Sequence, residues 1–399
     1  MAVGALLMVA TLSISLSQAF DSIDFHVIEF LFGMLTITVG FEKSGLMEYI
    51  VISLLKKAKN INMLLFGLIF GPGLLSAIFV NDTVALMVTP IALGICSKVG
   101  LRNPRSLLIP IAFGITIGST FTPIGNPQNL LVALNSSMSH PFEQFVAHLF
   151  LPSIISLICV YYLSRFFFKR DYRSNHDLSE TRKAISDSDT LISDMGLAKL
   201  SATILAALII SFAAIEVFPY LQSFGFTLYS LAFGAGVLLL VLSPRRVKLL
   251  RSFNWGILIF FVGMFIVMRA VWDSNIGSTM LSVLPTPIAG MRLQSTASIM
   301  FDSVTMSQIL SNVPFVQLYS YEMSNLAITG FNSLPWIALA AGSTLAGNLS
   351  FLGAVSNVII VQSAEAKGAK AFSFFEFLKY GFVVTAVTFL IFLVYLIAV

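Results

Sequence analysis

Residues 81–91 read NDTVALMVTPI, so an amide, a carboxyl and a hydroxyl group interrupt a long apolar stretch over 61–97. Crossing the hydrocarbon core of a bilayer takes roughly 20 apolar residues, and the arms on either side of this interruption are short. Lysines flank the stretch at both ends. Because positively charged loops remain in the cytoplasm, we expect 61–97 to form a re-entrant helical hairpin that enters and leaves on the cytoplasmic side.

The composition of the whole chain is typical of a membrane protein. Of its 399 residues, 57% are hydrophobic and 11% are charged, whereas soluble domains carry about 25% charged residues. The mean hydropathy is +0.91. These values exclude a soluble enzyme, a nucleic-acid-binding protein and a disordered hub. They predict an all-α polytopic membrane protein with the lipid bilayer as its surroundings.

The apolar runs give the expected spans. A second hairpin, entering from outside, together with the first places 21 of the 23 basic residues in the cytoplasm, with Arg269 and Arg292 as exceptions. Arg269 is expected to pair with an acid or to extend to the interface. The sequence thus predicts a multi-pass protein of the cytoplasmic membrane with its N-terminus inside and its C-terminus outside. The runs are 2–19 (interpreted as a span rather than a signal peptide), 24–42, 61–80, 83–97, 106–134, 143–168, 197–217, 224–242, 255–272, 296–330, 335–363 and 374–398.

Several short motifs occur twice at a nearly constant spacing. Asn81 at the first hairpin tip matches Asn312 at the second, an offset of 231 residues. Phe32-Gly33-Met34 matches Val262-Gly263-Met264, Gly118-Ser119-Thr120 matches Gly342-Ser343-Thr344, and Gly125-x-x-x-Asn129 matches Gly353-x-x-x-Asn357. The charge-derived orientation of the matching spans is opposite, so the two halves are predicted to be inverted-topology repeats.

This repeat predicts the domain organisation. The first repeat covers 1–168, with a re-entrant hairpin over 61–97 and a broken transmembrane helix over 106–134. A charged cytoplasmic linker covers 169–196. The second repeat covers 197–399, with a hairpin over 296–330 and a broken helix over 335–363. Inverted repeats with broken helices are typical of secondary transporters, in which the irregular backbone lines the substrate site.

Asp82 is the strongest single candidate for function, because a carboxylate at membrane depth is costly and is retained for a role. The small residues at the breaks are equally compatible with close helix packing, and the asparagines with helix capping. Asp302, early in the second hairpin, receives no role from the sequence. Half-helix N-termini suit an anion, and carbonyl and amide oxygens suit a cation.

Four motifs in order resemble the ion transporter superfamily: NDTVALMVTPI at 81–91, GSTFTPIGNPQN at 118–129, SNVPF at 311–315 and GNLSFLGAVSN at 347–357. The similarity covers nearly the whole chain and includes the arsenite permeases, the melanosomal P protein, NhaD-type Na+/H+ antiporters and the citrate and dicarboxylate carriers. The resemblance implies a scaffold domain and a transport domain, a possible homodimer and an elevator motion. The tips Asn-Asp-Thr and Ser-Asn-Val are more similar to the arsenite permease side than the Ser-Asn-Thr tips of the dicarboxylate carriers.

The sequence therefore predicts a secondary active transporter of a small anion or an arsenite-type solute, coupled to H+ or Na+, without a cofactor. The alternatives are an NhaD-type Na+/H+ antiporter, a Na+-coupled dicarboxylate or citrate carrier, and a passive channel. An enzyme is not expected, because the four histidines form no cluster. Na+ would bind at Asn81, Asp82 and Asn312. The full set of expected site residues is Asn81, Asp82, Thr83, Ser119, Thr120, Asn126, Asn129, Ser311, Asn312, Ser343, Thr344, Asn348, Ser356 and Asn357.

Overall fold

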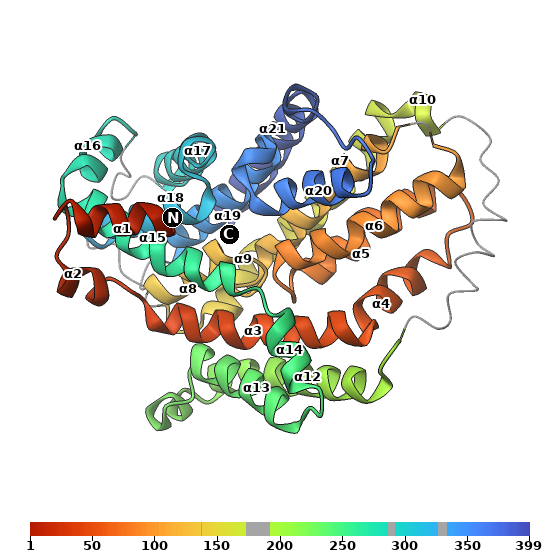
Figure 1. Cartoon of the computed structure of the whole chain (residues 1–399). Coiled ribbons are helices and arrows are strands. Elements are labelled where there is room, and N and C mark those ends of the chain that lie inside the picture. Colours follow the sequence, from red (N-terminus) through yellow and green to blue (C-terminus); the bar gives the residue numbers. More distant parts are fainter. Residues whose placement is uncertain (102, 137, 173–191, 286–291, 326–332) are drawn as a thin grey trace.

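A computed structural model describes residues 1–399 apart from 102, 137, 173–191, 286–291 and 326–332, and this described part is built from helices without strands (Figure 1). Six of its helices are long and apolar enough to cross a membrane: α3, α6, α9, α12, α15 and α21. The chain is therefore a polytopic membrane protein. The elements are α1 (Ala2–Ala10), α2 (Leu16–Asp21), α3 (Phe25–Ser44), α4 (Leu46–Leu55), α5 (Ile61–Ser76), α6 (Asn81–Val99), α7 (Arg105–Gly118), η1 (Ser119–Phe121), α8 (Pro127–Asn135), α9 (Pro141–Phe167), α10 (Lys169–Tyr172), α12 (Met195–Val217), η2 (Pro219–Phe224), α13 (Leu228–Leu242), α14 (Arg246–Ser252), α15 (Trp255–Asp273), α16 (Ile276–Ser282), α17 (Arg292–Leu310), α18 (Asn312–Asn325), α19 (Leu334–Leu349), η3 (Phe351–Gly353), α20 (Val355–Ala366) and α21 (Phe374–Ala398).

Helices α3, α12 and α13 form one layer at an edge of the molecule (Figure 1). The approach of α3 to α13 requires glycine, because a Cβ on Gly33 would lie 2.0 Å from the carbonyl oxygen of Ala232. Asp24 starts α3 by accepting from the His26 backbone N–H at 3.0 Å, and Gly45 ends it with a φ of 78°. Small residues thus set a rigid layer beside the rest of the bundle.

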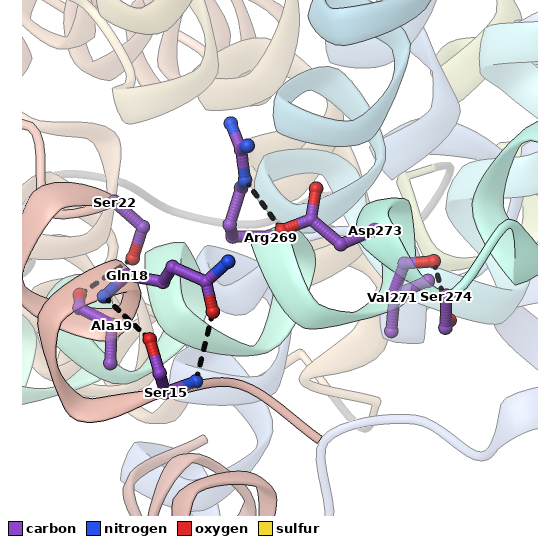
Figure 2. A network of polar contacts seen from close by, with 8 residues as sticks. All are labelled: Ser15, Gln18, Ala19, Ser22, Arg269, Val271, Asp273 and Ser274. Atoms are coloured by element: carbon purple, nitrogen blue, oxygen red, sulfur yellow. Dashed lines mark hydrogen bonds and ion pairs between the residues drawn. The ribbon is translucent and has the colours of Figure 1, made fainter. Parts of the chain in front are cut away.

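The N-terminal segment differs from the predicted span over 2–19. Helix α1 ends at Ala10, and Leu12 has a left-handed φ of 57°. Ser15 then starts α2 with a capping box, in which the Gln18 side chain accepts from the Ser15 N–H at 3.0 Å (Figure 2). The prediction of a single span is wrong, because hydroxyl side chains compete for backbone groups between the two helices and end the first.

Figure 2 also shows the partner of Arg269 on α15. Its Nε lies 2.9 Å from an oxygen of Asp273, one helical turn further along. Of the two fates expected for Arg269, pairing with an acid is therefore confirmed. Both side chains are partly exposed, so the pair stabilises the helix end only slightly.

Two pairs of helices occupy the predicted hairpin regions. In the first, α5 and α6 are joined by residues 77–80. In the second, α17 and α18 are joined by Ser311 alone, whose φ of 67° is uncommon for a residue other than glycine. Most of the predicted linker over 169–196 lies outside the described residues, which contribute α10 and the start of α12 there.

Elements from the two halves pack against each other in a crossed pattern. Helix α6 packs against α20, α8 against α18, α7 against α19 and α9 against α21. An ion pair between Arg105 and Glu376 joins the first turns of α7 and α21. Glu216 accepts from the backbone N–H of Phe142 at 2.6 Å and of Glu143 at 3.0 Å, so it caps α9. The centre of this packing holds both helix interruptions.

Candidate functional site

Both regions expected to contain a broken helix are interrupted. In the first, α7 ends at Gly118, η1 follows, and α8 begins at Pro127. Proline lacks a backbone N–H and restrains the residue before it to extended backbone, which is the conformation of Asn126. In the second, α19 ends at Leu349, and α20 begins at Val355 after extended residues at Ser350 and Ala354. Two irregular segments therefore lie within the packed interior.

Asn129 holds the first break together. Its Nδ2 donates to the carbonyl oxygens of Ser119 at 3.1 Å, Thr120 at 2.9 Å and Thr122 at 3.0 Å. Asn126 caps α8 by accepting from the Asn129 backbone N–H at 2.9 Å, and its Nδ2 lies 3.1 Å from the Ser119 hydroxyl. The predicted capping alternative for these asparagines thus describes this side of the site well.

Thr344 connects the two breaks. Its Oγ1 donates to Asn129 Oδ1 at 3.2 Å and accepts from Asn126 Nδ2 at 3.2 Å. These residues are more than 200 positions apart in the sequence and are fully buried or nearly so. The structure therefore brings together three of the predicted site residues from opposite halves.

The second break repeats one hydrogen bond of the first. Asn357 Nδ2 donates to the Gly347 carbonyl at 2.6 Å, as Asn129 donates to Ser119. Both partners are separated by the same offset of 228 residues, so Gly347 corresponds to Ser119. The predicted match of Gly118-Ser119-Thr120 with Gly342-Ser343-Thr344 is wrong by four residues, because a glycine-serine-threonine triplet recurs one helical turn away from the equivalent backbone.

Two residues that the sequence analysis missed anchor the breaks to the hairpins. Ser76 on α5 donates to the Ile115 carbonyl on α7 at 2.7 Å. Gln308 on α17 donates to the Ala346 carbonyl on α19 at 2.9 Å and accepts from the Ser350 hydroxyl at 2.6 Å. Each is a polar residue shortly before a hairpin tip in an otherwise apolar helix, and that placement was the available signal.

Several predicted site residues carry buried polar atoms without a hydrogen-bond partner in the described part of the chain. Native structures leave few such atoms unpaired, so each calls for a ligand, a water or an ion. Asn348 has both its oxygen and its nitrogen unpaired although it is fully buried. The unpaired atoms of the predicted set are Asn81 Oδ1, Asn312 Oδ1, Asn348 Oδ1 and Nδ2, Ser356 Oγ and Asn357 Oδ1.

The remaining predicted residues are placed as follows. Asp82 and Thr83 are partly exposed in the first turn of α6, and no basic side chain of the described residues forms an ion pair with Asp82. The hydroxyls of Ser119, Thr120 and Ser343 donate to carbonyls of their own helical segments, those of Thr116, Thr116 and Ala340. Ser311 forms the tip between α17 and α18.

Two helix starts at this place have no side-chain cap. Helix α6 begins at Asn81, whose backbone N–H donates to the Gly125 carbonyl of the first break at 3.1 Å. Helix α20 begins at Val355 after an uncapped Ala354, and it packs against α6. Uncapped helix N-termini carry free N–H groups and the positive end of the helix dipole. Together with the unpaired amides, they form a small polar site suited to a negatively polarised ligand.

The described residues contain no group of three or more histidine, cysteine, aspartate or glutamate side chains that could hold a metal ion. Oxygen donors for a monovalent cation come instead from Asn81, Asp82 and Asn312, the predicted Na+ residues, of which two carry unpaired oxygens.

Comparisons with known proteins agree with this architecture. An uncharacterized transporter of Mycobacterium tuberculosis is 31% identical over 374 residues, covering 91% of this chain and 83% of that protein. The P protein of Mus musculus is 25% identical, covering 96% of this chain and 55% of that protein. The solved structure of MtrF from Neisseria gonorrhoeae, described as illuminating a class of antimetabolite efflux pumps, matches with a TM-score of 0.59 at 12% identity, over 98% of this chain and 83% of that one.

The family model for citrate transporters matches residues 1–346. This match covers most of the chain and includes both hairpin regions and the first break. The chain belongs to the citrate transporter family and is a membrane transporter.

Proposed function

We propose that this protein is a secondary active transporter that moves a small anion or an arsenite-type solute across the cytoplasmic membrane, coupled to H+ or Na+. Two inverted repeats, with re-entrant hairpins over 61–97 and 296–330, would place the breaks at mid-membrane. The observation that carries the proposal is the set of unpaired buried amide and hydroxyl atoms beside two uncapped helix starts. A substrate would supply the missing partners.

The chemistry of the site favours an oxyanion or a neutral oxygen-rich solute. Ser356 and Asn357 lie in the first turn of α20, where free backbone N–H groups also point toward the ligand. Asn348 adds an amide that can both donate and accept. Hydrogen-bond donors of this kind bind an anion without a basic side chain, and they also bind a neutral hydroxyl compound.

Asp82 supplies the coupling in this proposal. Its carboxylate would repel an anion beside it, and a charged group resists crossing the dry part of the membrane. Binding of H+ to Asp82, or of Na+ to the oxygens of Asn81, Asp82 and Asn312, would neutralise that charge before the loaded site moves. Anion and cation would therefore cross together or exchange, depending on which side releases the cation.

Citrate or a dicarboxylate is the second candidate substrate, because the family model that matches the chain is that of citrate transporters. Both substrates need the same donors, in larger number. A homodimer with an elevator motion and an NhaD-type Na+/H+ exchange remain further proposals, and the latter would need no anion at all.

The test is flux into proteoliposomes that contain an internal pH dye. Na+, arsenite, a dicarboxylate and citrate are added in turn against an imposed gradient. Proton movement that requires arsenite or a carboxylate supports the proposal and identifies the substrate class. Proton movement with Na+ alone would make the protein a cation antiporter instead.

Asp82→Asn tests the coupling residue in the same assay, with Asp273→Asn as the matched control. Asp273 is a carboxylate at a helix end that pairs with Arg269. We expect Asp82→Asn to lose the dependence of flux on pH or Na+, and Asp273→Asn to keep it. Intact coupling in Asp82→Asn would exclude the role assigned to Asp82.

A further inference from the structure

A second carboxyl group lies deep in the molecule and has no part in the site described above. Asp302 is on α17, ten residues from the start of that helix at Arg292, which is about 15 Å along the helix axis. Its side chain is 0% exposed, and neither carboxyl oxygen has a hydrogen-bond partner in the described part of the chain. An ionised carboxylate in this position would lack both water and a counter-charge, at a cost far above that of an ordinary buried polar group.

One polar side chain approaches this carboxyl. The hydroxyl of Tyr319, from α18, is close enough to interact with Asp302, although the geometry falls short of a hydrogen bond. Tyr319 is itself buried and packs against the ring of Phe315 at a centroid distance of 5.3 Å. Asp302 and Tyr319 thus form a pair inside the two-helix unit of α17 and α18 (Figure 1).

The helices packed around α17 bring no charge to Asp302. Helix α17 packs against α18, α19, α21 and η3. Helix α19 and η3 carry no titratable side chain, and Glu322 of α18 acts on Tyr319 rather than on Asp302. The titratable groups of α21 are engaged elsewhere: Glu376 with Arg105, Lys379 with the Tyr380 ring, Tyr380 with Phe167 and Phe168, and Tyr395 with the Ala147 carbonyl.

A row of hydroxyl groups leads along α17 to this position. Ser295, Ser298 and Asp302 follow each other at spacings of three and four residues, so they lie on one face of the helix. Ser295 is half-buried, Ser298 is buried, and the Ser298 hydroxyl donates to the Ser295 carbonyl at 3.1 Å. This face therefore connects the Arg292 end of α17, where the side chains are exposed, with the buried carboxyl.

We propose that Asp302 is a second proton-carrying site, which binds one proton reversibly during the transport cycle and is separate from Asp82. The step forms one O–H bond between a proton from water and the carboxylate, and it is reversed on release, with no other bond changed. The neutral acid is the form that matches the apolar, uncharged surroundings in this structure. The inference deepens the proposed function and rests on it, since it assigns H+ as a coupling ion.

A proton fits this position better than a metal cation. Hard cations need about six oxygen ligands, and the phenol of Tyr319 is the one side-chain oxygen that reaches Asp302 among the groups described. A protonated carboxyl needs a single acceptor or donor partner, which Tyr319 provides once the two side chains adjust slightly. The Asn81, Asp82 and Asn312 oxygens are the better location for Na+.

Infrared difference spectroscopy on the full chain in liposomes tests the proposal without any substrate. We expect a pH-dependent carbonyl band of a protonated carboxylic acid. This band should disappear in Asp302→Asn and persist in Asp82→Asn and Asp273→Asn, and Tyr319→Phe should shift its frequency. A spectrum in which Asp302→Asn removes no such band, or a band that Na+ removes at constant pH, would overturn the proposal. If Asp302→Asn does not fold, the shift in Tyr319→Phe still decides.

Transport adds a readout that a purely structural role would not move. Asp302→Asn should reduce proton flux per substrate at least tenfold while substrate binding persists, and Asp302→Glu should restore it. A loss of stability in both variants with an unchanged pH profile would assign Asp302 a structural role. If the wild-type protein transports none of the substrates tested, the proposed function fails, and the infrared band still shows whether Asp302 carries a proton.

Discussion

The two helix breaks are built on the same plan, but they differ in how completely their polar groups are paired. In the first break, Asn129 satisfies three carbonyls and Asn126 caps α8. In the second, Asn357 makes one such bond, and both polar atoms of Asn348 are unpaired. A break that is fully bonded is a rigid wall, whereas a break with unpaired atoms is the side that can bind a ligand. The comparison suggests a division of labour between the halves.

The packing of the neighbouring helices differs in the same direction. A Cβ on Gly118 would lie 2.0 Å from the Gly73 carbonyl oxygen, so α7 and α5 are in backbone contact there. At an offset of 228, the second half has Ala346, and a side chain is therefore tolerated. Gly114 and Gly342 meet Ile69 and Met300 at comparable distances of 2.7 and 2.9 Å from the carbonyl oxygens. The first half is thus the tighter one at the break itself.

Gly118→Ala should have the largest effect, because the new methyl group would overlap backbone atoms that cannot move aside. We expect a loss of several kcal/mol, at or beyond the upper end of the usual 1–3 kcal/mol for overpacking (about that range). The measurement is the yield of monodisperse protein in detergent and its thermal melting temperature. Gly94→Ala is the control, since nothing lies within 4 Å of a Cβ there. Equal stability of the two variants would contradict the tighter packing of the first half.

Asn129→Ala should destabilise the protein more than Asn357→Ala. The first change leaves three buried carbonyls without their donor, and the second leaves one. Each orphaned group costs about 1–3 kcal/mol, so we expect a difference of about 2 kcal/mol or more between the variants. Melting curves of both proteins in the same detergent measure it. An equal or inverted order would show that the two breaks are not paired as differently as the hydrogen bonds indicate.

Hydropathy and charge were sufficient to predict most helices and both interruptions, because the segregation of apolar residues determines which segments can be helical in a bilayer. They failed at Thr11–Ser15, where local hydroxyl groups end α1. The exact correspondence between the halves also required the structure. A repeated triplet is a local pattern, whereas the partner of Asn357 depends on how the backbone folds over the break. For the same reason Ser76 and Gln308 were missed, since their roles are defined by tertiary contacts.

Asn348→Ala should change substrate binding rather than stability. Its side chain makes no hydrogen bond within the described residues, so its removal costs the empty protein little beyond packing. A lost bond to a bound substrate would weaken binding roughly tenfold, which corresponds to about 1.4 kcal/mol. The dependence of flux on substrate concentration, alongside the melting temperature, separates the two effects. An Asn348→Ala protein with unchanged substrate dependence would remove the second break from the binding site.

Thr344→Val should have the smallest effect and directly probes the link between the two halves. Valine keeps the shape but removes the hydroxyl that donates to Asn129 and accepts from Asn126. Because Asn129 keeps its three carbonyl partners and Asn126 keeps Ser119, we expect a loss of about 1 kcal/mol, that of one ordinary hydrogen bond. Melting curves of Thr344→Val, Asn129→Ala and the double variant measure the coupling between the two residues. If the Thr344 bond depends on the wall formed by Asn129, the double variant will lose less than the sum of the single ones. Strict additivity would instead mean that the two halves meet at Thr344 without supporting each other.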